Sequence, residues 1–225
     1  MMNQKIYNAT LELAKSDLMM NSYKDFYNGK GYFLTKNKNL LGATKRPYAF
    51  PEKKGFESDW RKLEQNQRRY LAFLANVDER RISVHQYEAL KKAFDKWKSA
   101  YFVVYYGIDK GYACNLFVGE AIYWAGKDTS SGGKYLSAKQ ISQGIGSFKL
   151  IEDKKNVEIG NIVAFGSTHV EIVTKVNRDY YYFDDDFCSR GAGRGNSDFG
   201  TERCEGLSRS REINNENIRF FKIEI

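Results

Sequence analysis

The segment YACNLFVGEAIYWAG, residues 112–126, carries the clearest structural and chemical signal in this chain. Its apolar residues recur at helical spacing, and Gly126 stands where a helix commonly ends. Cys114 opens this helix, so its thiol should face the positive end of the helix dipole and the unpaired N–H groups of the first turn. We therefore interpret Cys114 as a candidate nucleophile with oxyanion donors beside it. The alternative is an ordinary buried cysteine.

The segment EIGNIVAFGSTHVEIVTKV, residues 158–176, predicts two strands, at 161–165 and 169–176. His169 begins the second strand, and a histidine at a strand end can reach the start of a neighbouring helix. Alone, such a histidine is more often structural. Paired with Cys114, it forms the activated nucleophile of acyl-transfer enzymes.

A third polar group should orient the imidazole, and three consecutive aspartates are the candidates. We expect a third strand at 180–186, and a tight hairpin would place Asp186 and Asp184 on the face of His169, with Asp186 nearest. A turn one residue longer or shorter would select Asp185 instead. The alternatives are a solvated acidic turn or a weak divalent-ion site.

The remaining chain predicts an α+β protein with two regions. Helices are expected over 3–28, from Ser58 onward, and from Ser83 to Val104, and we place a boundary near residue 100. Residues 1–100 then form a helical region and residues 101–225 form the domain with the strands. A Gly- and Arg-rich loop of nearly thirty residues precedes a last strand at 218–225.

Charge and hydropathy exclude some classes of protein. The net charge is +8, and residues 1–100 hold 20 Lys and Arg against 11 Asp and Glu. This basic half could attract polyanions, or it could be a solvated helical face. The longest apolar run, Ala100–Tyr106, has seven residues, whereas a membrane-spanning helix needs ~20. We expect no membrane span, and the first 22 residues lack the apolar core of a classical signal peptide.

The chain has three cysteines and two histidines. With Cys114 set aside as a free thiol, Cys188 and Cys204 could form a disulfide in an oxidising compartment, or remain two free thiols in a cytosol. Zinc would need four ligands from a chain with few such residues, so we expect no metal and no cofactor.

The two quoted segments resemble the cysteine and histidine blocks of the NlpC-type and CHAP (cysteine- and histidine-dependent amidohydrolase/peptidase) cell-wall hydrolases. The resemblance covers roughly residues 107–187. It implies a papain-like core, a nucleophile helix packed on a small antiparallel sheet, with Cys114 as nucleophile and His169 as base. The expected substrate is an amide bond in a peptidoglycan stem peptide.

Further site residues follow from the same resemblance. Tyr112 and Asn115 flank the nucleophile and are candidates for the oxyanion site and cleft. Glu171 stands where the family usually has a small residue, and it should share the face of His169 and line the cleft.

Amidase effectors of type VI secretion share this pattern and lack signal peptides. The resemblance thus implies an antibacterial effector, secreted without a classical signal, that acts in the periplasm or wall of a target cell. A cognate immunity protein and a secretion-system component would be its partners. Two alternatives stay open: a papain-like toxin acting on a protein, as a protease, deamidase or transglutaminase-like enzyme, and a non-enzymatic polyanion-binding protein. Nucleic acid is the less favoured polyanion, because no nucleic-acid-binding motif is visible.

Overall fold

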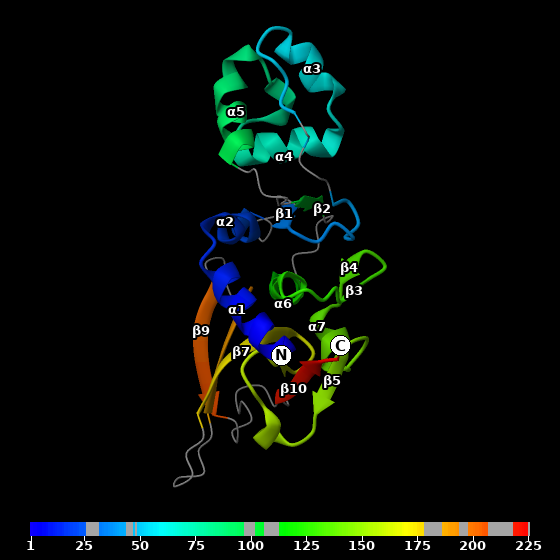
Figure 1. The fold of residues 1–225 in the computed structure, drawn as a ribbon, viewed down its shortest axis with the longest axis vertical. Helices are drawn as coiled ribbons and strands as arrows, with labels where there is room; N and C mark the ends of the chain where they lie inside the picture. The colour runs from blue at the N-terminus through cyan, green and yellow to red at the C-terminus, as the bar shows by residue number, and fades with distance from the viewer. Residues whose placement is uncertain are drawn as a thin grey trace. The chain divides into compact units, whose positions relative to one another are not determined.

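The chain combines helices with antiparallel sheets, in agreement with the predicted α+β class. The computed structural model (Figure 1) describes residues 1–25, 32–43, 47, 49–96, 102–105, 113–177, 186–193, 198–206 and 218–224. The chain divides into two compact units: unit 1 is Met1–Phe33 with Tyr106–Ile225, and unit 2 is Leu34–Tyr105.

This division differs from the predicted one, 1–100 and 101–225, because the first 33 residues belong to the same unit as the C-terminal half. Helix α1 (Met2–Ala14) buries Ile6 and Leu13 completely and contacts helix α6 (Ala113–Trp124) and the sheet. The contact is close, since a Cβ at Gly160 would lie 2.0 Å from the Asn3 carbonyl oxygen. The N-terminal helix thus completes the C-terminal core.

A six-stranded antiparallel sheet, in the order β5-β10-β6-β7-β8-β9, forms the centre of unit 1. Its strands are β5 (Phe148–Ile151), β6 (Ile162–Phe165), β7 (His169–Asn177), β8 (Asp186–Ala192), β9 (Phe199–Gly206) and β10 (Ile218–Ile223). Consecutive residues of β7 are buried from Val170 to Thr174, so both faces of this strand are covered. Helix α6 contacts α1, β4, β7 and β8, and most of its described side chains are buried.

The strands predicted at 161–165 and 169–176 correspond to β6 and β7. The prediction of one long loop between residues 186 and 218 is wrong, because β8 and β9 form a hairpin within it. Tertiary packing favours this hairpin: the Phe199 ring lies 5.2 Å from the Phe117 ring of α6 and 4.9 Å from the Tyr23 ring. The part of the predicted strand at 180–185 lies outside the described residues.

The smaller elements of unit 1 surround α6 and the sheet. They are α2 (Asp17–Asp25), β3 (Ser130–Ser131), β4 (Lys134–Tyr135), α7 (Ala138–Ser142) and the 3₁₀ turn η4 (Lys154–Asn156). The helix predicted over 3–28 is interrupted at Ser16, because the Ser16 hydroxyl accepts the Met19 N–H and caps a new helix.

Unit 2 is mainly helical, and its two ends pair as strands. It contains the second half of β1 (Tyr32–Thr35), α3 (Phe56–Lys62), α4 (Gln65–Ala75), the 3₁₀ turns η2 (Glu79–Arg81) and η3 (Val84–Gln86), α5 (Tyr87–Lys96) and β2 (Phe102–Tyr105). Its core consists of Phe56, Trp60, Leu71, Leu90 and Phe94.

Two helices predicted here are wrong in extent. The helix expected to run from Ser83 to Val104 does not reach Val104: α5 is described over Tyr87–Lys96, and Phe102–Tyr105 pairs with β1, since aromatic and β-branched residues fit a strand well. The helix expected from Ser58 onward is interrupted at Leu63, whose backbone is extended. Among the described residues, no helix is both long and apolar enough to cross a bilayer.

Candidate active site

Cys114 is the second residue of α6 and is 5% exposed. The helix that carries it is fixed by its own buried residues, including Phe117 and Val118, both fully buried. The thiol thus lies in the first turn of a rigid helix, where backbone N–H groups have no partner within the helix. This is the local environment predicted from the sequence.

His169 is the first residue of β7, and the structure brings it to Cys114. The Cys114 side chain lies close enough to raise the pKa of the His169 imidazole, although 55 positions separate the two residues in the chain. The imidazole side chain is 13% exposed and stacks on the Phe165 ring of β6, with 5.8 Å between ring centroids. Helix α6 contacts β7, and this packing brings the start of α6 toward His169.

Glu171 supplies the polar group that orients the imidazole. Its Oε1 lies 2.7 Å from His169 Nε2, and its side chain is only 3% exposed. Residues i and i+2 of a strand point to the same face, so β7 itself places the two side chains together. Because Nε2 is bonded to Glu171, Nδ1 is the ring nitrogen left for Cys114 Sγ.

The electrostatics of this group of three favour a protonated histidine. Burial lowers the pKa of the His169 imidazole, whereas hydrogen bonds to Cys114 and Glu171, and attraction to their negative charges, raise it. The effects of Cys114 and Glu171 outweigh the effect of burial, so the pKa of His169 rises from 6.5 to about 9. At neutral pH the imidazole therefore carries a proton that it can donate.

Glu171 is itself held in place by β8. Ser189 Oγ donates a hydrogen bond of 2.6 Å to Glu171 Oε2, so both carboxylate oxygens have partners. Gly191 lets the β8 backbone approach closely, because a Cβ there would lie 2.6 Å from Glu171 Cγ. Sequence reasoning missed Ser189 and Gly191, since neither belongs to a motif and only the β7–β8 pairing brings them to Glu171.

The predicted orienting role of Asp186 does not agree with the structure. Asp186 pairs with Asn177, at the end of β7 opposite to His169. The predicted hairpin was too tight: the observed pairing joins Ile172 to Arg190, with a register shift between Val173 and Lys175. Two alternates, Asp184 and Asp185, lie outside the described residues, as does Tyr112.

Asn115 is turned away from a role in the oxyanion site. Its Nδ2 donates to the carbonyl oxygens of Tyr135, at 3.4 Å, and Leu136, at 3.1 Å. The Asn115 amide nitrogen thus joins α6 to the end of β4 and to the residue that follows it. The donors that remain for an oxyanion are backbone N–H groups of the first turn of α6.

The two remaining cysteines form a disulfide. Cys188 of β8 lies directly opposite Cys204 of β9, and a covalent bond joins them, which leaves Cys114 as the free thiol. The bond is one residue from Ser189, the hydrogen-bond partner of Glu171. Within the described part of the chain, no group of three or more His, Cys, Asp and Glu side chains is arranged to hold a metal ion.

Comparison with models of known protein families, with curated proteins and with solved structures gives no significant match for this chain.

Proposed function

We propose that unit 1 is a cysteine hydrolase that cleaves amide bonds in peptidoglycan stem peptides. The observation that carries this proposal is the series Cys114, His169 and Glu171, in which Glu171 hydrogen-bonds the imidazole and the buried Cys114 thiol lies close enough to raise the imidazole pKa. A nucleophile, a base and a group that orients the base are the parts that covalent acyl transfer requires.

The architecture supports a papain-like core. The thiol stands in the first turn of a buried helix, and this helix packs on an antiparallel sheet whose strand β7 begins with the histidine. The assignment to cell-wall substrates rests on the resemblance of residues 112–126 and 158–176 to the NlpC-type and CHAP hydrolases.

The reaction would proceed through an acyl-enzyme. The proton of the Cys114 thiol resides on His169, and Sγ attacks the carbonyl carbon while N–H groups of the first turn of α6 stabilise the oxyanion. His169 then donates the proton to the leaving amine as the C–N bond breaks. A water molecule, deprotonated by His169, attacks the thioester and releases a carboxylate and the free thiol.

We further propose that the protein acts as an antibacterial effector in the periplasm or wall of a target cell. The disulfide between Cys188 and Cys204 supports this compartment, because disulfides persist in oxidising environments and are rare in the cytosol.

Digestion of purified peptidoglycan, followed by mass spectrometry of the fragments, tests the proposed activity. We expect new amine and carboxylate ends from the parent protein and none from Cys114→Ala. A protein panel serves as the substrate control and should remain intact. Equal digestion by the Cys114→Ala variant, or cleavage of proteins alone, would refute the assignment.

A thiol assay separates the site from its substrate. Cys114 is the free cysteine of the chain, so the rate of alkylation by iodoacetamide reports on this residue alone. We expect His169→Ala to slow alkylation near neutral pH, because the imidazole no longer takes the proton of the thiol. His85→Ala, at the exposed second histidine, is the matched control.

A further inference from the structure

Unit 2 contains a basic pocket whose function the hydrolase proposal does not explain. The pocket has a volume of about 500 Å³ and lies beside α3, α4 and η2. Its charged lining residues are Arg61, Arg68, Arg69, Arg80, Glu57 and Glu79. Four arginines face two glutamates, so the lining carries an excess of two positive charges.

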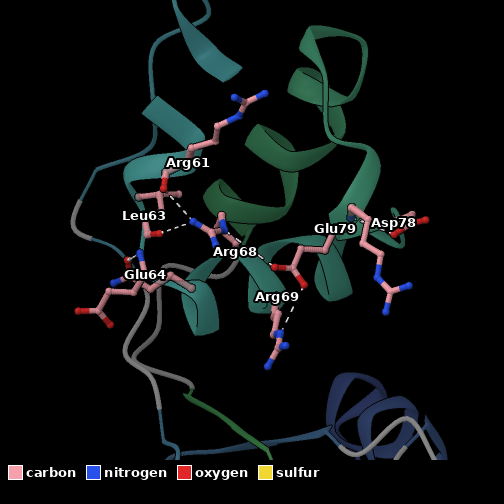
Figure 2. Close-up of polar contacts among 9 residues, drawn as sticks. Arg61, Leu63, Glu64, Arg68, Arg69, Asp78 and Glu79 are labelled. Carbon is pink, nitrogen blue, oxygen red and sulfur yellow. Dashed lines mark hydrogen bonds and ion pairs between the residues drawn. The ribbon is translucent and has the colours of Figure 1, made fainter. Parts of the chain in front are cut away.

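Two of these arginines are held in position before any ligand binds (Figure 2). Arg68 Nη1 donates to the carbonyl oxygens of Arg61, at 2.8 Å, and Leu63, at 2.9 Å, at the end of α3. Glu79 lies between the two guanidinium groups, 3.9 Å from Arg68 Nε and 3.4 Å from Arg69 Nε. This fixed arrangement lowers the entropy lost when an anion binds.

The other two arginines supply the uncompensated charge. The side chains of Arg61 and Arg80 form no ion pair with a carboxylate in the described part of unit 2. Their charge is therefore free to bind an external anion. Guanidinium groups match phosphate oxygens in pairs of parallel hydrogen bonds, which makes phosphate the favoured partner.

The lining also indicates what the phosphate is attached to. Among the described residues that line it, Trp60 is the only aromatic one, and this side chain is 4% exposed because it belongs to the core of unit 2. Single-stranded nucleic acids bind through bases stacked on exposed aromatic rings, and this pocket offers none. A chain of sugar or polyol phosphates needs no such ring.

We propose that this pocket of unit 2 binds a phosphate of a sugar-phosphate or polyol-phosphate chain. The proposal does not depend on the hydrolase activity of unit 1, since none of its residues belongs to the Cys114 site. Such a polyanion would hold the protein on a phosphate-rich surface or polymer through electrostatic contacts.

Binding of a glycerol phosphate oligomer to the full chain, carrying Cys114→Ala to suppress the proposed hydrolysis, tests this proposal by calorimetry. The double variant Arg61→Gln/Arg80→Gln should bind about ten-fold more weakly and lose part of the salt dependence. The matched control is Lys62→Gln/Arg81→Gln, which removes the same charge from the adjacent exposed residues outside the pocket. It should bind within two-fold of the parent.

A second measurement needs no variant. Bound oligomer should protect Arg61 and Arg80, but not Arg81, from phenylglyoxal, as read by mass spectrometry. Equal weakening in the control pair, equal protection of Arg81, or no binding would overturn the proposal. So would tighter binding of a single-stranded oligonucleotide with the same number of phosphates.

Discussion

At the scale of single residues, the site depends on a carboxylate that follows the histidine by two positions. Glu171 bonds His169 through one oxygen and Ser189 through the other, and it is nearly inaccessible to water. A buried carboxylate is stable in its charged form only when such partners are present. Together, Cys114 and Glu171 explain why the pKa of His169 is raised despite burial.

Replacing Glu171 with glutamine should keep the shape of the side chain and remove its charge. Both the hydrogen bond and the charge attraction that raise the pKa of His169 are then weakened, so this pKa should fall, as measured by NMR titration. Hydrolysis of peptidoglycan should slow on the order of 100-fold. Glu202→Gln is the matched control, because Glu202 bonds Thr174 and Arg190 of the same sheet and not His169. A pKa of His169 that does not move would contradict this role.

The raised pKa of His169 also predicts how stability depends on pH. The protonated form is favoured in the folded state, with a pKa of about 9 against 6.5 for an ordinary histidine. This contribution is therefore complete below pH 6.5 and is lost as the pH rises through about 9. We expect the free energy of unfolding to fall by about 1 to 3 kcal/mol over this window.

Urea denaturation at a series of pH values measures this effect. His169→Gln should remove most of the decrease, whereas His85→Gln, at an exposed site, should retain it. An identical pH dependence in the parent protein and in His169→Gln would show that another group is responsible.

At the scale of elements, helix α6 requires a glycine where the β3–β4 hairpin crosses it. A Cβ at Gly119 would lie 2.4 to 2.8 Å from three atoms of the Tyr135 ring. The Tyr135 hydroxyl also donates to Glu120, a fully buried carboxylate that accepts a second hydrogen bond from Trp124. The ring is thus fixed and has no room to move away.

Gly119→Ala should destabilise the protein by about 1 to 3 kcal/mol, because the added methyl group overpacks this contact. In a helix without this contact, replacing Gly with Ala would stabilise the helix by roughly 1 kcal/mol. A loss of stability would therefore indicate the overlap with the Tyr135 ring. A double-mutant cycle with Tyr135→Ala supplies the control. With the ring removed, the penalty should disappear, and a penalty that persists would contradict the proposed overlap.

We expect the disulfide between Cys188 and Cys204 to stabilise the β8–β9 hairpin. Cys188→Ser/Cys204→Ser should lower the free energy of unfolding on the order of 3 kcal/mol, because the bond closes a segment of sixteen residues. Reducing agent should destabilise the parent protein to the same degree and leave the double variant unchanged. If reduction has no effect on the parent in urea denaturation, the bond contributes nothing to stability.

The sequence predicts best those elements that are determined by residues close together in the chain. Capping boxes of Ser83 with Gln86 and of Ser137 with Gln140 begin η3 and α7 and involve neighbouring residues alone. Strands β6 and β7 match their predicted ranges within one residue. Phe102–Tyr105 was assigned to a helix, because its spacing continued the apolar pattern of the preceding residues. Its pairing with β1, nearly seventy residues away, outweighed that pattern.

At the scale of the whole molecule, unit 2 is an insertion between two segments of unit 1. Strands β1 and β2, near the two ends of this insertion, pair with each other. Helix α1 precedes the insertion yet belongs to the core of unit 1, where it contacts α6, β7, β9 and β10. Unit 1 therefore needs both ends of the chain.

Two deletions should consequently have opposite effects. Replacing residues 36–101 with a short glycine-rich linker should leave cooperative unfolding and the alkylation rate of Cys114 close to those of the parent. Deleting residues 1–16 should abolish cooperative unfolding, because it removes the buried side chains of α1. Calorimetry and iodoacetamide labelling distinguish these outcomes, and survival of the fold without α1 would contradict the division into units.

Sequence alone determined that Cys114 opens a helix, that His169 begins a strand, and that the chain combines α and β structure. These features depend on the order of neighbouring residues, through helix periodicity, alternation and capping. Only the tertiary structure decided that Glu171 rather than Asp186 orients the histidine, and that the first helix packs with the last strand. Strand register and helix docking are set by burial of side chains distant in sequence, a free energy that no local pattern contains.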